Sequence, residues 1–247
     1  MIALVSLGLI SFLSWLMSML AGGGSPLILI PVVNFLLGPQ AIAPTITIGM
    51  LVGNLQRTLF FWRSIHWRVT LWHLPGTLVG VTLGSYLLSR IHVEGLQTIV
   101  AIVLILMALN TWFGGPKYAL RIKDWHFLPL SFLNSFVSGL IGSTGPILNP
   151  IYLHYGLEKE QLIATKSATV VLIHVIKMIT YLIFGILTLP YFLYGLLIGL
   201  AAIPANWIGK LILERMSAAQ FRQVVLGFVA ISGLWMLWQQ RNLLSLW

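Results

Sequence analysis

Two short glycine-rich stretches interrupt apolar segments and are the first candidates for chemistry. One is Ala21-Gly22-Gly23-Gly24-Ser25-Pro26 and the other is Ile141-Gly142-Ser143-Thr144-Gly145-Pro146. Glycine disfavours a helix, whereas proline suits the first turn of one, so each stretch predicts a helix, a break and a second helix. A helix N-terminus carries unpaired N–H groups and the positive end of the helix dipole. Two such ends, with the nearby hydroxyls, predict an anion site; the alternative is that the glycines only let helices pack closely.

Two basic residues, Arg57 and Lys177, lie well inside apolar segments. A cation at that depth is costly unless it faces a partner or a wet cavity. No Asp or Glu lies deep in any apolar segment, so an anionic substrate would be a natural partner. The alternative for Arg57 is that its long side chain reaches the membrane interface.

Asn54 and His174 lie one helical turn before these two cations, on the same predicted helix faces. Both could hydrogen-bond an oxyanion, and His174 could also accept a coupling proton. The alternative is a hydrogen bond between helices. Asn149, on the segment after the second glycine stretch, is a secondary candidate for the same site.

The composition predicts a membrane protein. The chain of 247 residues is 58% hydrophobic and 8% charged, whereas soluble domains carry about 25% charged residues. The absence of cysteine excludes disulfides and thiolate sites, and the histidines lack metal-ligand spacing, so we expect no metal and no cofactor. No phosphate-loop, GxSxG or HExxH motif is present, which argues against an enzyme. The basic residues are dispersed over short loops, a pattern typical of membrane orientation and not of nucleic-acid binding.

The apolar segments form two similar halves. Pro26 and Pro146 are 120 positions apart, and the same offset pairs Asn54 with His174 and Arg57 with Lys177. We therefore predict a duplicated, all-α, polytopic membrane protein with a first repeat over 1–113, a linking loop over 114–127 and a second repeat over 128–247. The expected apolar segments are 2–21, 26–38, 43–63, 70–90, 95–113, 128–141, 146–157, 162–185, 188–213 and 219–240.

The short segments after the glycines decide the topology. If they cross the membrane, each half has five spans and the repeats are inverted. Apart from Arg57 and Lys177, all basic residues except Arg90 and Arg241 then lie on one side. If they re-enter instead, each half has four spans and the basic residues divide evenly. The positive-inside rule favours the five-plus-five arrangement, with both termini outside.

With both glycine stretches in place, the chain resembles the TauE/SafE, or sulfite-exporter, family of membrane proteins. The residues that carry the resemblance are Leu20 to Pro31 and Gly139 to Pro146, followed by Pro150; the second stretch departs from the family pattern at Ser143 and Thr144. The resemblance implies a multi-pass secondary transporter of the prokaryotic cytoplasmic membrane that moves a small sulfur-containing anion such as sulfite or an organosulfonate. An anion channel and a non-transporting membrane scaffold remain alternatives.

Overall fold

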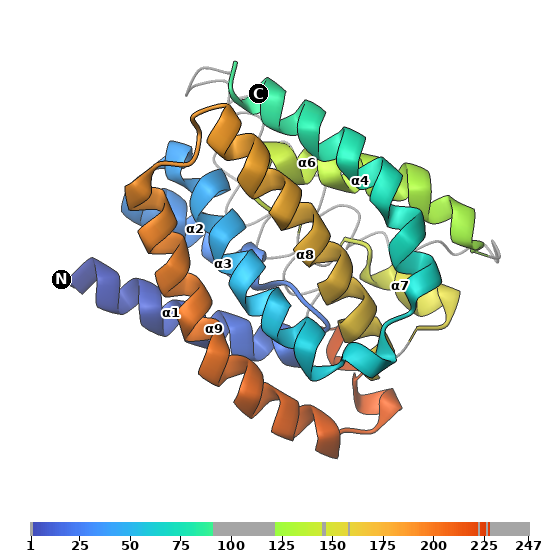
Figure 1. Ribbon diagram of the computed structural model, residues 1–247. Coiled ribbons are helices and arrows are strands. Elements are labelled where there is room, and N and C mark those ends of the chain that lie inside the picture. Colours follow the sequence, from blue (N-terminus) through green and yellow to red (C-terminus); the bar gives the residue numbers. More distant parts are fainter. Residues whose placement is uncertain are drawn as a thin grey trace, which may run out of the picture.

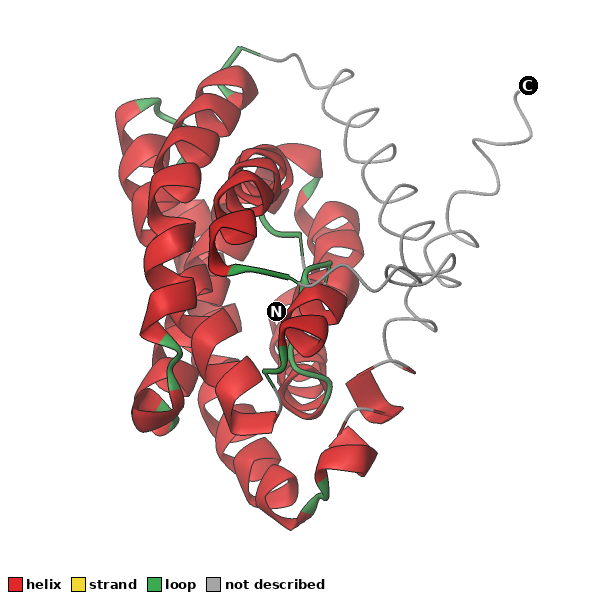
Figure 2. Cartoon of the chain, turned by 90° about the vertical axis from the view of Figure 1, so that its right-hand side faces the viewer, coloured by secondary structure: helices red, strands yellow, loops and turns green. Residues whose placement is uncertain are grey.

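The computed structural model describes residues 2–90, 122–144, 147–157, 159–221, 223–225 and 227. Within these ranges the regular elements are all helices, and Figure 2 shows them joined by loops without any strand. The α-helices are α1 (Ile2–Leu20), α2 (Ser25–Leu37), α3 (Pro39–Phe60), α4 (Trp67–Leu88), α6 (Phe127–Ile141), α7 (Asn149–Tyr155), α8 (Lys159–Ile183) and α9 (Leu189–Arg215). Short 3₁₀ turns cover Trp62–Ser64 and Asp124–His126.

The predicted helix order is confirmed over the described residues. The first glycine stretch separates α1 from α2, and α2 begins at Ser25 with Pro26 in its first turn. The second stretch is longer than expected, because the chain resumes a helix only at Asn149 and α7 has seven residues. The predicted segment 95–113 and most of 219–240 lie outside the described residues, as does most of the linking loop.

Helix α8 runs through the middle of the bundle (Figure 1). It packs against α3 on one side and α4 on another. Helix α4 packs along α6, and α9 packs along both α1 and α3. Of the described helices, α8 and α9 are long and apolar enough to cross a membrane by themselves.

Glycines let the backbones of α4 and α6 approach closely. A Cβ atom added at Gly76, Gly80 or Gly84 would collide with a backbone carbonyl oxygen of α6. These three glycines recur every four residues and therefore form one stripe along α4. Contacts of this kind hold membrane helices together, because lipid offers no hydrophobic drive for helix association. The stripe fixes α4, and with it the side chains that α4 contributes to the interior.

We expect Gly80→Ala to destabilise the fold by roughly 1–3 kcal/mol, because the new methyl group has no room against the Phe132 carbonyl. The measurement is thermal unfolding of the purified protein in detergent. Thr82→Ala is the matched control, since Thr82 is exposed on the same helix. Equal melting temperatures for the two variants would contradict the tight α4–α6 contact.

Candidate functional site

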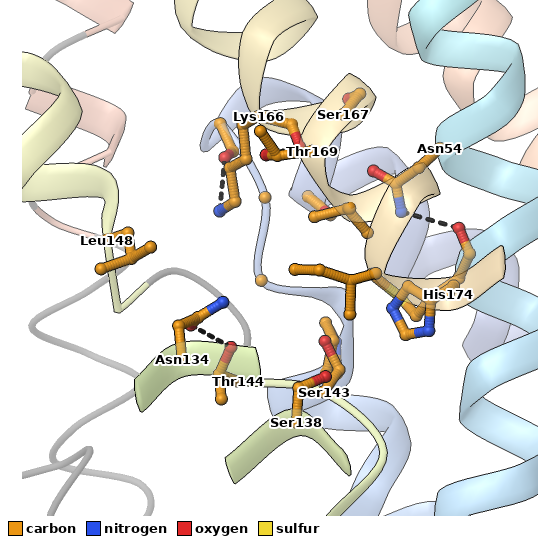
Figure 3. A pocket seen from close by; sticks show the side chains of 18 of the residues that line it. Asn54, Asn134, Ser138, Ser143, Thr144, Leu148, Lys166, Ser167, Thr169 and His174 are labelled. Atoms are coloured by element: carbon orange, nitrogen blue, oxygen red, sulfur yellow. Dashed lines mark hydrogen bonds between the residues drawn. The ribbon is translucent and has the colours of Figure 1, made fainter. Parts of the chain in front are cut away.

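A cavity in the centre of the bundle is lined by both glycine stretches. Its volume is about 30 Å³, room for two or three water molecules. Figure 3 shows Lys166 and Thr169 on one side and Ser143, Thr144 and Asn134 on the opposite side, with Asn54 and His174 on the flank between them. Further lining residues are Ser18 of α1, His73 of α4, Tyr152 of α7 and Leu148, which directly precedes α7.

The first glycine stretch adopts a backbone that only glycine tolerates well. The φ angles of Gly22, Gly23 and Gly24 are 66°, 118° and 121°, all in the left-handed region. A Cβ atom on Gly23 would also collide with the amino group of Lys166. All three glycines line the cavity, whereas the buried Ser25 hydroxyl points to the Met50 sulfur at 3.4 Å.

Lys166 of α8 holds this first stretch in place. Its Nζ donates to the Gly22 carbonyl at 3.0 Å and to the Asn149 side-chain oxygen at 2.6 Å. The amide of Asn149 donates in turn to the Ala21 carbonyl at 3.3 Å. Two carbonyl groups that lost their helical partners at the break are thus satisfied by side chains from the second half of the chain. The ammonium group has three N–H donors, and two are used here.

Lys177 plays the corresponding part at the second stretch. Its Nζ donates to the Gly142 carbonyl, and it lies 3.4 Å from the Ser138 hydroxyl. Gly142 has a φ of 94° and packs against α3 near Ala43. The Thr144 hydroxyl donates to the Asn134 side-chain oxygen at 2.6 Å, which leaves both groups at the cavity wall.

Arg57 reaches the cavity from α3 and binds only neutral acceptors. It donates to the Asn206 side-chain oxygen at 2.8 Å, the Ser18 hydroxyl at 3.2 Å and the Trp15 carbonyl at 3.0 Å. The guanidinium carbon also lies 4.7 Å from the centre of the Trp15 ring. Asn54 lies one helical turn before Arg57, and its side-chain amino group donates to the Met50 carbonyl at 2.8 Å. The side-chain oxygen of Asn54 takes no part in that hydrogen bond. Arg57 is therefore fixed inside the protein and does not extend to the interface.

The described carboxylates all lie away from the cavity. Asp124 pairs with Arg68 at 2.5 Å, Glu160 with Lys159 at 3.4 Å and Glu214 with Lys210 at 3.7 Å. Arg57 and Lys166 thus face the cavity with no carboxylate among its described lining residues. Buried His174 also lines it, and its Nδ1 atom has no hydrogen-bond partner among the residues that the structure describes. Charges interact strongly where water is scarce, so this arrangement favours a small anion.

The structure brings most of the candidate residues together. Gly22, Gly23, Gly24, Asn54, Arg57, Ser143, Thr144 and His174 line one cavity. Ser25, Gly142 and Lys177 are next to it but outside its lining, and Gly145 lies outside the described residues. Within the described ranges, no group of His, Asp or Glu side chains could hold a metal ion.

Sequence reasoning missed Lys166, together with His73, Tyr152 and Thr169. Lys166 falls inside the predicted segment 162–185, so its place in an apolar helix was a usable signal. The positive-inside count instead includes Lys166 among the charges that report orientation. His73 lies near the start of the predicted segment 70–90 and Tyr152 in the middle of the segment 146–157, and nothing in their spacing brings them together.

Comparison with known proteins agrees with this picture. The family model described as sulfite exporter TauE/SafE matches residues 7–236, which include both glycine stretches and nearly all the described helices. No curated protein and no solved structure matched the chain. TauE/SafE proteins are multi-pass membrane transporters, which confirms the predictions of membrane location and of a transporter rather than an enzyme. The chain belongs to the TauE/SafE sulfite exporter family.

Proposed function

We propose that the protein is a secondary transporter that carries a small sulfur-containing anion, such as sulfite or an organosulfonate, across the cytoplasmic membrane. The anion would bind in the central cavity between the two glycine stretches. The observation that carries this proposal is the pairing of two buried basic side chains, Arg57 and Lys166, with hydroxyl donors and with no carboxylate among the described lining residues.

The donors around the cavity suit an oxyanion. Lys166 retains one N–H beyond those it gives to Gly22 and Asn149, and Ser143 and Ser167 add hydroxyls at the wall. Charge-assisted hydrogen bonds of this kind are about twice as strong as neutral ones. A compact anion with three or four oxygens would replace the two or three waters that the cavity can hold.

Equivalent contacts in the two halves support the predicted repeat, which we propose to be inverted with five segments in each half. Arg57 donates to Ser18, and 120 positions later Lys177 contacts Ser138. Gly84 of α4 packs against Gly139 of α6, while Gly209 of α9 packs against Met19 of α1. The α4–α6 contact therefore corresponds to the α9–α1 contact when one half of the chain is matched to the other. Transporters built this way expose a fixed site to each side in turn.

The repeat would be asymmetric at the site itself. Lys166 has Ile46 as its counterpart in the first half, so one stretch is anchored by a cation at the cavity and the other is not. We infer that Lys166 contacts the anion directly and that Lys177, outside the lining, supports the second stretch.

The experiment that tests the function is a thermal-shift screen of the purified protein with sulfite, sulfate, thiosulfate, taurine and sulfoacetate. A ligand that binds only the folded protein raises its melting temperature. Saturable uptake of the best anion into proteoliposomes, with counterflow, would identify a carrier rather than a channel. A screen in which none of the five anions stabilises the protein would contradict the proposal.

We expect Lys166→Met to weaken sulfite binding about 10- to 100-fold, since the loss of a charged hydrogen bond costs about 1.5–3 kcal/mol. Titration calorimetry in detergent measures this affinity. Lys210→Met is the control, because Lys210 pairs with Glu214 outside the cavity. Because Lys166→Met also frees the Gly22 carbonyl, Ser143→Ala tests the opposite wall independently. Wild-type affinity in both variants would contradict the site.

Lys177→Met should have a different signature. Removing Nζ leaves the buried Gly142 carbonyl without that donor, so we expect a loss of stability of roughly 1–3 kcal/mol. The anion affinity of the folded protein should fall less than in Lys166→Met. Unfolding and titration of the same samples give both quantities, and the reverse order of affinities would place Lys177 at the anion instead.

A further inference from the structure

Three helices bring a histidine, a tyrosine and a threonine together at the cavity wall. The Tyr152 hydroxyl of α7 lies 2.9 Å from Nε2 of His73 on α4 and 3.4 Å from the Thr169 hydroxyl of α8. All three residues line the cavity. The His73, Phe127 and Tyr152 rings form a cluster, with the His73 centroid 5.1 Å from that of Phe127 and 5.8 Å from that of Tyr152, and the latter two 5.5 Å apart. The group is buried and rigidly packed.

The contacts determine where the protons lie. Nδ1 of His73 is 2.9 Å from the Val69 carbonyl, and a carbonyl can only accept, so Nδ1 carries a proton. In the neutral ring Nε2 is then an acceptor, and the Tyr152 hydroxyl must donate to it. The Thr169 hydroxyl donates to the Lys166 carbonyl at 2.8 Å. In this state the Tyr152 proton points to His73 and is not offered to a bound anion.

A proton on His73 would reverse this arrangement. Protonated Nε2 becomes a donor, and the Tyr152 oxygen must accept from it. Tyr152 keeps its own proton and rotates it toward Thr169 and the cavity. One proton taken from water thus adds a positive charge to the cavity wall and turns Tyr152 into a hydrogen-bond donor for a bound anion. The only covalent bond that breaks is the O–H bond of the water species that gives its proton to His73.

From this geometry we propose that His73 and Tyr152 form the proton-coupling site of the transporter, at which one proton binds together with the anion. The inference rests on the proposed function and extends it to the coupling ion. The ionisable groups that share the cavity with His73 are Arg57 on α3, Tyr152 on α7, and Lys166 and His174 on α8, while α6 presents the ring of Phe127. No described carboxylate lines this wall, so the bound anion itself is the partner that favours a protonated His73.

Titration calorimetry of the purified full chain tests the proposal, in buffers of different ionisation enthalpy between about pH 5.5 and pH 8. Thiosulfate and sulfate are the probes, because neither takes up a proton in this range, whereas sulfite does. We expect the wild type to take up about one proton per anion and to lose affinity as the pH rises, by up to about tenfold per pH unit.

His73→Gln should show no gain in affinity at low pH, because glutamine accepts a hydrogen bond from the Tyr152 hydroxyl but stays neutral. Tyr152→Phe keeps the ring and should also lose the low-pH gain. His154→Gln is the matched control, an exposed histidine on α7, and should behave as the wild type. In case a variant fails to fold, ¹⁵N-histidine spectra of the wild type should show Nε2 of His73 protonated on addition of thiosulfate.

The outcomes separate the two proposals. Anion binding without proton uptake in the wild type overturns the coupling site and leaves the proposed function standing. A full pH dependence in His73→Gln, or an equal loss of affinity at every pH, also overturns it, since the proton then binds elsewhere or His73 is only structural. If none of the five anions of the thermal-shift screen binds the wild type, the proposed function fails and this inference with it.

Discussion

The structure depends on one constraint, that backbone carbonyls released where a helix breaks inside a membrane must find donors within the protein. Here lysines of a single helix supply them. Lys166 donates to the Gly22 carbonyl and Lys177 to the Gly142 carbonyl, and these two glycines are 120 positions apart. The lysines are 11 residues apart, close to three helical turns, so one face of α8 contacts both breaks. The central position of α8 follows from this requirement.

The same constraint explains the electrostatic character of the cavity. Neutral carbonyls and amides satisfy the hydrogen bonds of Arg57 and Lys166 without neutralising their charge. A carboxylate in either place would form an ion pair and compete with any anion. The described carboxylates instead pair with Arg68, Lys159 and Lys210, outside the cavity lining. The interior is therefore held together by groups that leave it attractive to negative charge, which suits a family of sulfite exporters.

Much of this fold could be predicted from local sequence, because hydropathy and the glycine–proline stretches act over short distances. The bounds of α2, α3 and α8 lie within a few residues of the predicted segments. The late start of α7 could not be predicted, since an apolar stretch does not reveal where a helix resumes. The hydrogen-bond partners of Arg57 could not be predicted either, because Asn206 is 149 positions away in the chain. For the cavity, sequence identified the two breaks and Arg57, whereas the contacts of Lys166 and of His73 with Tyr152 arise only when distant helices pack.

The anchoring of both breaks to α8 has a mechanical consequence. A helix that is tied at two points about three turns apart cannot slide or roll without disturbing both ties together. In the transporter that we propose, movement of one glycine stretch would be transmitted along α8 to the other, so that opening on one face of the membrane would accompany closing on the opposite face. Independent movement of the two glycine stretches would require α8 to release at least one of its two lysines.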